Sequence, residues 1–137
     1  VSLYKLRDSL EKYLEKILKE VAPNFSELAG TILAAKLIAK AGGLGKLARM
    51  ASSTIQLLGA EKALFRYLHG RGKVPKHGLI YIHPLIQKAP KKHRGKVARA
   101  LASKLSMAAK IDFYSKEDKS KELKRELEER IKEILKS

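Results

Sequence analysis

The N-terminal part of the chain shows a helical pattern of apolar residues. Across residues 3–21 the apolar positions recur every three or four residues, the spacing of one helix face, and Pro23 ends the pattern. Asn24 or Ser26 can cap a second helix that runs to a stop at Gly42–Gly43. Two helices joined by a short turn predict an antiparallel hairpin. Because one hairpin buries little area alone, we expect its partner surface to lie outside this chain, which we interpret as an excised piece of a longer protein.

Apolar runs in the middle of the chain are short and are separated by Gly, Pro and Ser. Three Gly and one Pro between Gly70 and Gly78 indicate an exposed loop. The apolar run Leu79–Ile82 is short enough to be either strand-like or one turn of helix. Further short helices are predicted over residues 44–51, 60–69 and 84–90.

Two longer helices are predicted towards the C-terminus. Apolar positions define one over residues 91–111, and Ser115 with Asp118 resembles a capping box for another over residues 116–136. Acid-to-base pairs four residues apart, such as Glu126 with Arg130, should support this last helix, which can pack on the domain or project as an arm. No segment alternates apolar and polar residues with period two, so we predict an all-α fold.

The basic residues of the chain are concentrated in one region. Residues 36–110 contain seventeen Lys and Arg and a single acid, Glu61, whereas residues 1–35 and 111–137 are each electrically balanced. The whole formal net charge of +16 therefore comes from the middle segment. A uniformly basic chain can simply be soluble, but this neutral–basic–neutral order indicates a surface for a polyanion, with nucleic acid as the default partner.

Composition narrows the remaining classes of function. A chain of 137 residues of which 45% are apolar suits one domain with a real core. It has no Cys, hence no disulfide and no thiolate metal site, and no apolar run is long enough to span a membrane. The basic region offers one carboxylate and four scattered His residues, where a hydrolase needs paired carboxylates or a metal cluster. We therefore predict that the protein is not an enzyme and uses no metal or cofactor.

Three groups of basic residues form the predicted polyanion-binding site. The first group is Lys62, Arg66 and His69, which share one face of the expected helix over residues 60–69. The second is the loop group of Arg71, Lys73, Lys76 and His77. The third is Lys91, Lys92, Arg94, Lys96 and Arg99. This last group stands at the start of a helix, where cations oppose the helix dipole but where phosphate binds well. A cationic helix face often contacts only water. Here the shortage of neighbouring acids favours the binding of a polyanion.

Four sequence blocks between residues 53 and 112 resemble those of one known family. They are Ser53–Arg66 (STIQLLGAEKALFR), Pro75–Tyr81 (PKHGLIY), Arg94–Arg99 (RGKVAR) and Leu105–Asp112 (LSMAAKID). Their order is similar to that of the Nop domain, and the helix after Pro23 resembles the end of that family's coiled coil. The chain looks most like the archaeal scaffold of box C/D guide-RNA particles. The resemblance divides it into a coiled-coil hairpin remnant (1–42), a Nop domain (43–115) and a C-terminal amphipathic helix (116–137).

The resemblance implies a non-catalytic scaffold module that binds RNA. In this family the all-α domain binds a kink-turn RNA together with a small kink-turn-binding ribosomal-type protein, in particles that guide 2′-O-methylation of RNA. Gly59, Ala60, Glu61 and Lys62 should then lie where the RNA and that protein meet. Gln56 and the four His residues should stand at the surface, where they can read or stack on unpaired bases. Fibrillarin, which methylates with S-adenosylmethionine, and self-dimerisation are expected for the full-length protein but not for this part of it.

Two other functions stay open at the level of the sequence. A spliceosomal-type or ribosomal-type Nop-domain protein would carry the same blocks and bind a different RNA. An RNA-processing enzyme would need metal- or cofactor-dependent turnover, which we do not expect. The Lys- and Glu-rich last helix favours an archaeal origin and hence the cytoplasm, whereas a eukaryotic chain of this type would be nucleolar.

Overall fold

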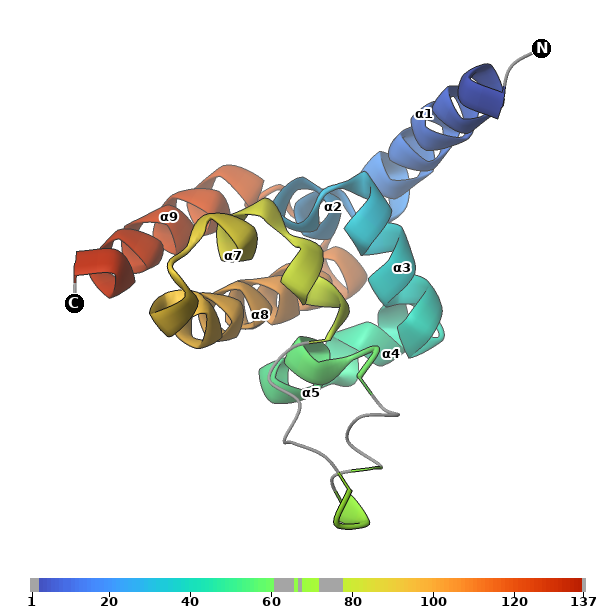
Figure 1. The fold of residues 1–137 in the computed structure, drawn as a ribbon. Helices are drawn as coiled ribbons and strands as arrows, with labels where there is room; N and C mark the ends of the chain where they lie inside the picture. Colours follow the sequence, from blue (N-terminus) through green and yellow to red (C-terminus); the bar gives the residue numbers. More distant parts are fainter. Residues whose placement is uncertain (1–2, 61–65, 67, 72–77, 137) are drawn as a thin grey trace.

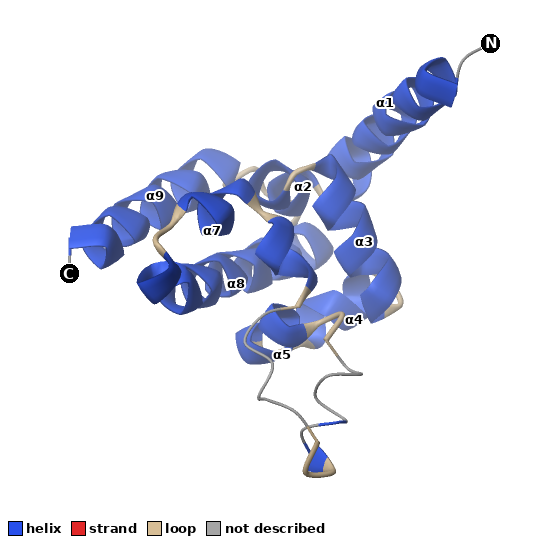
Figure 2. Cartoon of the chain, in the orientation of Figure 1, coloured by secondary structure: helices blue, strands red, loops and turns tan. Residues whose placement is uncertain are grey.

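The computed structural model describes residues 3–60, 66, 68–71 and 78–136. Its N-terminal half contains α1 (Leu3–Val21), α2 (Pro23–Ala29), α3 (Thr31–Ala41), α4 (Leu44–Arg49) and α5 (Ser52–Leu57). Its C-terminal half contains η1 (Leu79–Ile82), α7 (Pro84–Lys88), η2 (Lys91–His93), α8 (Arg94–Lys110), η3 (Ile111–Ser115) and α9 (Ser120–Lys136). Among the residues with assigned structure none lies in a strand, and Figure 2 shows helices throughout. The predicted all-α fold is confirmed.

Helix α8 is the centre of the fold. It contacts α2, α4, α5, α7 and α9, and these helices surround it in Figure 1. Its buried side chains are mainly small or branched, namely Val97, Ala98, Leu101, Ala102, Leu105, Ala108 and Ala109. Small side chains let neighbouring backbones approach closely, so one helix can serve as the core for several others.

The second predicted helix is divided in two. Gly30 has a φ of +87° and separates α2 from α3, a conformation that glycine adopts at little steric cost. Helix α2 therefore turns into the domain, where Asn24 and Phe25 are fully buried, and it contacts α8 and α9. The predicted stop at Gly42 is confirmed, because its left-handed backbone lets its N–H reach the carbonyl groups of Ile38 and Ala39.

Helix α1 contacts α2 and α3 and then extends away from the rest of the domain (Figure 1). Its outer part exposes Leu6, Leu10 and Tyr13, whereas Leu18, near the domain, is buried. Core residues lie on both sides of the predicted boundary at residue 42, and the division of the chain into three parts stays a prediction.

The last helix begins later than its apolar pattern indicates. Residues 111–115 continue α8 as a π-helix, in which the Ser115 hydroxyl donates to the Ile111 carbonyl at 3.2 Å. Ser115 therefore does not cap α9. Asp118 does, since its Oδ1 accepts hydrogen bonds from the Ser120 hydroxyl at 2.8 Å and from the Ser120 N–H at 3.3 Å.

Helix α9 packs on the domain, which settles its orientation. It contacts α8 and α2 and buries Leu123, Leu127, Ile131 and Ile134. Glu126 pairs with Lys104 of α8 at 2.5 Å, and this ion pair and hydrogen bond lower the pKa of the Glu126 carboxyl group. Glu126 thus links α9 to α8, in place of the predicted pair with Arg130 along the same helix.

Candidate nucleic-acid interface

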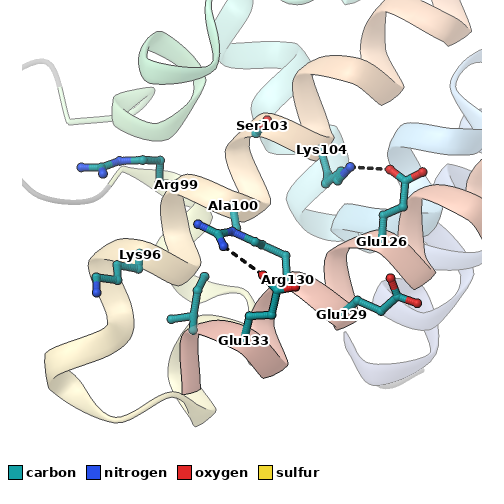
Figure 3. A pocket seen from close by; sticks show the side chains of 10 residues that line it. Lys96, Arg99, Ala100, Ser103, Lys104, Glu126, Glu129, Arg130 and Glu133 are labelled. Atoms are coloured by element: carbon teal, nitrogen blue, oxygen red, sulfur yellow. Dashed lines mark hydrogen bonds and ion pairs between the residues drawn. The ribbon is translucent and has the colours of Figure 1, made fainter. Parts of the chain in front are cut away.

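The start of α8 presents exposed cations with no acid in the first helical turn. Lys91 and Lys92 lie in the short helix η2, and Lys96 and Arg99 follow on α8. Positions 96 and 99 are three residues apart on α8 and therefore share one side of that helix. Figure 3 shows Lys96 and Arg99 on the α8 side of a pocket whose α9 side carries Glu126, Glu129 and Glu133, and the ends of both cations extend away from these acids. This arrangement leaves both cations accessible to an external anion near a helix N-terminus, which itself favours phosphate.

Arg94 differs from its cationic neighbours because its guanidinium group bonds within the protein. Its Nε donates to the Ala89 carbonyl at 3.1 Å, and one terminal nitrogen donates to the Tyr81 hydroxyl at 2.9 Å. The other terminal nitrogen lies 3.4 Å from the Gln87 carbonyl, and the group sits 5.9 Å from the centre of the Tyr81 ring. Arg94 thus holds η1, α7 and α8 together. These bonds give Arg94 a structural role, and its part in phosphate binding stays a prediction.

Two of the three His residues that the structure describes are buried, so their predicted surface position is wrong. His93 is 6% exposed and His83 is 9% exposed. The Leu85 N–H donates to Nδ1 of His83 at 3.1 Å, so the proton sits on Nε2, which donates to the Leu28 carbonyl at 2.8 Å. Burial lowers the pKa of His83, and the bond to Leu28 opposes this only in part. His83 is therefore a neutral residue that joins α7 to α2.

The two ends of the segment between α5 and η1 are joined by backbone hydrogen bonds. The Gly78 N–H donates to the Gln56 carbonyl at 2.8 Å, and the Leu79 N–H donates to the Leu58 carbonyl at 2.8 Å. A Cβ atom on Gly78 would lie 2.2 Å from the Leu58 oxygen, so only glycine fits there. Residues 56–58 and 78–79 are consequently neighbours, and the segment that carries the predicted RNA contacts starts and ends at one place on the domain.

Only some of the predicted contacts of this segment lie among the described residues. Arg66, His69 and Arg71 are exposed, and the His69 and Arg71 N–H groups donate to the Arg66 carbonyl at 3.2 and 2.7 Å. These bonds form a tight turn at Gly70, whose φ is +74°. Glu61, Lys62, Lys73, Lys76 and His77 lie outside the described residues.

Three predicted RNA contacts lie where the backbone bonds of Gly78 and Leu79 hold the two ends of the segment together, namely Gln56, Gly59 and Ala60. Gln56 is half-buried in α5, Gly59 is exposed, and the Ala60 N–H donates to the Leu57 carbonyl at 2.9 Å. Gly59 has a φ of +95°, and a Cβ atom there would lie 2.5 Å from Leu79. The geometry therefore fixes where the segment leaves the domain, and the RNA contacts of Gln56, Gly59 and Ala60 stay predictions.

Sequence reasoning missed three polar residues that hold these elements. Tyr81 anchors Arg94, and Asn24 with Asp112 connects α2 to the end of α8. A signal was present, because Asn24 follows Pro23 at a helix start and Asp112 is an isolated acid in a basic, apolar context. Their partners are far apart in the chain and could not be paired without the fold.

Within the described part of the chain, no group of three or more His, Asp and Glu residues could hold a metal ion. No helix in those residues is both long and apolar enough to cross a membrane.

Comparison with known sequences assigns the family. Residues 1–136 match the Nop family, which is described as "snoRNA binding domain, fibrillarin". The chain belongs to the Nop family. Its predicted membership is thereby confirmed, and the match includes both α1 and α9 as well as the motif blocks.

Similar Nop proteins occur in archaea and eukaryotes. Over 132 residues the chain is 54% identical to an uncharacterized NOP5 family protein of Methanocaldococcus jannaschii, covering 96% of this chain and 32% of that protein. It is 47% identical over 133 residues to nucleolar protein 56 of Saccharomyces cerevisiae, covering 95% of this chain and 26% of that protein. The chain thus spans about a third or less of the length of these relatives.

A solved structure shares the fold. The chain matches the crystal structure of a fibrillarin/Nop5p complex with a TM-score of 0.77 and 39% identity, over 96% of this chain and 49% of the other. The arrangement of α1 to α9 around α8 is therefore the Nop fold.

Proposed function

We propose that this chain is a non-catalytic RNA-binding module of a box C/D ribonucleoprotein that guides 2′-O-methylation of RNA. The observation that carries the proposal is the group of exposed cations at the start of α8, formed by Lys91, Lys92, Lys96 and Arg99, with no acid in the first helical turn. The description of the Nop family as a snoRNA-binding domain supports RNA as the polyanion.

Binding at this face would rest mainly on phosphate neutralisation. Lys96 and Arg99 point to the same side of α8, and the N–H groups at the start of this helix add a favourable dipole (Figure 3). Each neutralised phosphate releases counterions, which adds about 0.7–0.9 to the slope of log affinity against log salt. RNA affinity should therefore fall steeply as salt rises.

The kink-turn RNA would be bound together with a small kink-turn-binding ribosomal-type protein. The joined ends of the segment between α5 and η1 support this, because the backbone bonds of Gly78 and Leu79 fix the place where Gly59 and Ala60 leave the domain. For the longer relatives we infer that fibrillarin and a second copy bind through other parts of the protein. In an archaeal cell the module would act in the cytoplasm, and in a eukaryotic cell it would act in the nucleolus.

A gel-shift series tests the proposal. Kink-turn RNA and an unrelated RNA of equal length are titrated with the chain, with and without the kink-turn protein. We expect the kink-turn RNA to bind more tightly in its presence, and a spliceosomal stem-loop to compete less well than a box C/D guide RNA. Arg99→Ala should weaken binding several-fold and reduce the salt slope by about 0.7–0.9. Arg7→Ala, which removes an exposed cation of α1, is the matched control.

Equal binding of both RNAs in both conditions would contradict the composite site. A loss of affinity that is the same for Arg7→Ala and Arg99→Ala would show that net charge, rather than the α8 face, governs binding.

A further inference from the structure

The end of α8 opposite to the cationic start carries two exposed aromatic residues. Phe113 is 38% exposed and Tyr114 is 63% exposed, and both belong to the π-helix η3. Their rings meet edge to face, with centroids 5.0 Å apart and planes at 81°.

Contacts with two other helices, α2 and α4, fix the backbone that carries Phe113 and Tyr114. Asp112, which is 1% exposed, accepts hydrogen bonds from the Asn24 and Phe25 N–H groups at 3.1 and 2.8 Å. The Phe113 ring lies over Gly45 of α4, where a Cβ atom would stand 3.1 Å from two ring carbons. Tyr114 is therefore presented on a fixed backbone, which lowers the entropy lost when a ligand packs on its ring.

Exposed cations and a methionine follow the same helices as the exposed rings. Lys110 precedes Tyr114 by four residues and Met107 precedes it by seven, and all three are exposed. The Lys110 ammonium group donates to the Ser106 hydroxyl at 2.9 Å, so Lys110 would exchange this bond for one to a phosphate. Arg49 follows Gly45 by four residues on α4 and is also exposed. We name Arg49, Met107, Lys110, Phe113 and Tyr114 the aromatic platform.

The two acids closest to the aromatic platform in sequence are already engaged. Both carboxylate oxygens of Asp112 accept hydrogen bonds from α2, and Glu117 pairs with Lys119 at 3.5 Å. Helices α3, α4 and α8 contain no acidic residue at all. An anionic ligand would therefore meet attraction and little repulsion here.

We propose that the aromatic platform is a second RNA subsite, which binds unpaired nucleotides. A base would stack on Tyr114 while Lys110 and Arg49 neutralise the adjoining phosphates, the combination used for single-stranded nucleic acid. A duplex would not use the ring, because its base faces are already stacked. With fourteen residues of helix between Lys96 and Lys110, the two sites stand about 20 Å apart, so one RNA could span both. This inference rests on the RNA-binding role proposed above.

Fluorescence anisotropy with a labelled single-stranded RNA and a duplex of the same length tests the subsite. Tyr114→Ala should weaken single-strand binding about fivefold or more and leave duplex binding within about twofold. Tyr114→Phe keeps the ring and should bind like the wild type. Tyr13→Ala is the matched control, because Tyr13 on α1 is 62% exposed and stands far from the platform in sequence.

Two results would overturn the subsite alone, namely wild-type affinity of Tyr114→Ala for the single strand, or an equal loss for both RNAs. A wild-type chain that binds no RNA would overturn the proposed function as well. Ultraviolet crosslinking of the wild-type chain needs no variant, and mass spectrometry should find an adduct on Phe113 or Tyr114. The absence of any adduct within residues 107–116 would also overturn the proposal, leaving a protein partner to cover the rings.

Discussion

The buried carboxylate of Asp112 caps the helix that begins beside Asn24, which lies 88 residues earlier in the chain. Oδ1 accepts hydrogen bonds from the Asn24 side chain at 2.7 Å and from its N–H at 3.1 Å, and Oδ2 accepts one from the Phe25 N–H at 2.8 Å. The Asn24 amide also donates to the Glu117 carbonyl and accepts from the Lys119 N–H. Two side chains thus fix α2, the end of α8 and the approach to α9 in one network.

Removing this cap should destabilise the whole domain. Asp112→Ala would leave the Asn24 and Phe25 N–H groups buried without partners, at a cost of about 3 kcal/mol in the free energy of unfolding. Urea unfolding monitored by circular dichroism measures the change. Asp118→Ala, which removes the exposed cap of α9, is the matched control and should cost much less. Equal losses for both variants would show that burial of the Asp112 network adds nothing to stability.

The stability of the domain should depend on the ionisation of His83. Burial lowers the pKa of His83 below its unfolded value of 6.5, so the unfolded chain binds more protons when the pH falls below that value. The stabilising effect of neutral His83 is thus fully present above about pH 6.5 and is lost as the pH falls towards the lowered pKa. Urea midpoints of the wild type should decrease between pH 7.5 and pH 5.5.

His83→Asn separates this effect from other titrations. The Asn oxygen can still accept from the Leu85 N–H at the start of α7, but the variant cannot titrate or reach Leu28. It should be less stable than the wild type at pH 7.5, and the difference should narrow at pH 5.5. An unchanged difference across this range would rule out His83 as the titrating group.

Glycine should be required at residue 78 and not at residue 95. A Cβ atom on Gly78 would meet the Leu58 oxygen at 2.2 Å and the Leu57 carbonyl carbon at 2.7 Å, and neither backbone atom can move without breaking the join. Gly78→Ala should therefore cost about 2–3 kcal/mol in the free energy of unfolding and weaken RNA binding. Differential scanning calorimetry and the gel-shift series measure the two effects.

Gly95→Ala is the control for this substitution. Nothing lies within 4 Å of a Cβ atom built on Gly95, which stands in the first turn of α8. Because alanine favours a helix over glycine, this variant should be unchanged or more stable by up to about 1 kcal/mol. If both glycine variants behaved alike, the close contact at Gly78 would not be what holds residues 78–79 against residues 56–58.

Arg94 and Arg99 should affect different properties although they share one helix. Arg94→Ala removes the bonds to Ala89 and Tyr81 and should lower the melting temperature. Arg99→Ala should leave the melting temperature within about one degree and weaken RNA binding, because its side chain is exposed. Thermal unfolding and gel shifts on both variants give a two-by-two comparison. If Arg94→Ala weakened RNA binding without lowering the melting temperature, Arg94 would contact phosphate, as the sequence predicts, and would not act by holding the helices together.

The hydrophobic pattern predicted most helices but placed several ends wrongly. Period alone identifies α1, α8 and α9, because one apolar face of a long helix repeats many times. The break at Gly30 and the π-helix at Ile111–Ser115 were not predicted. Asp112 lies in that π-helix and its carboxylate bonds to the start of α2, and no local pattern reports a contact across 88 residues.

The sequence by itself determined that this chain is helical, that its charge lies in residues 36–110, and that its motif blocks are those of the Nop family. These properties follow from local spacing, residue type and order along the chain. Only the tertiary structure decided which basic and His residues are available to a ligand. Arg94 and Lys96 are both cations near the start of α8, yet one bonds to η1 and α7 while the other faces outward. His83 and His69 differ in the same way, because burial depends on which distant element packs against a residue, and that is a property of the fold.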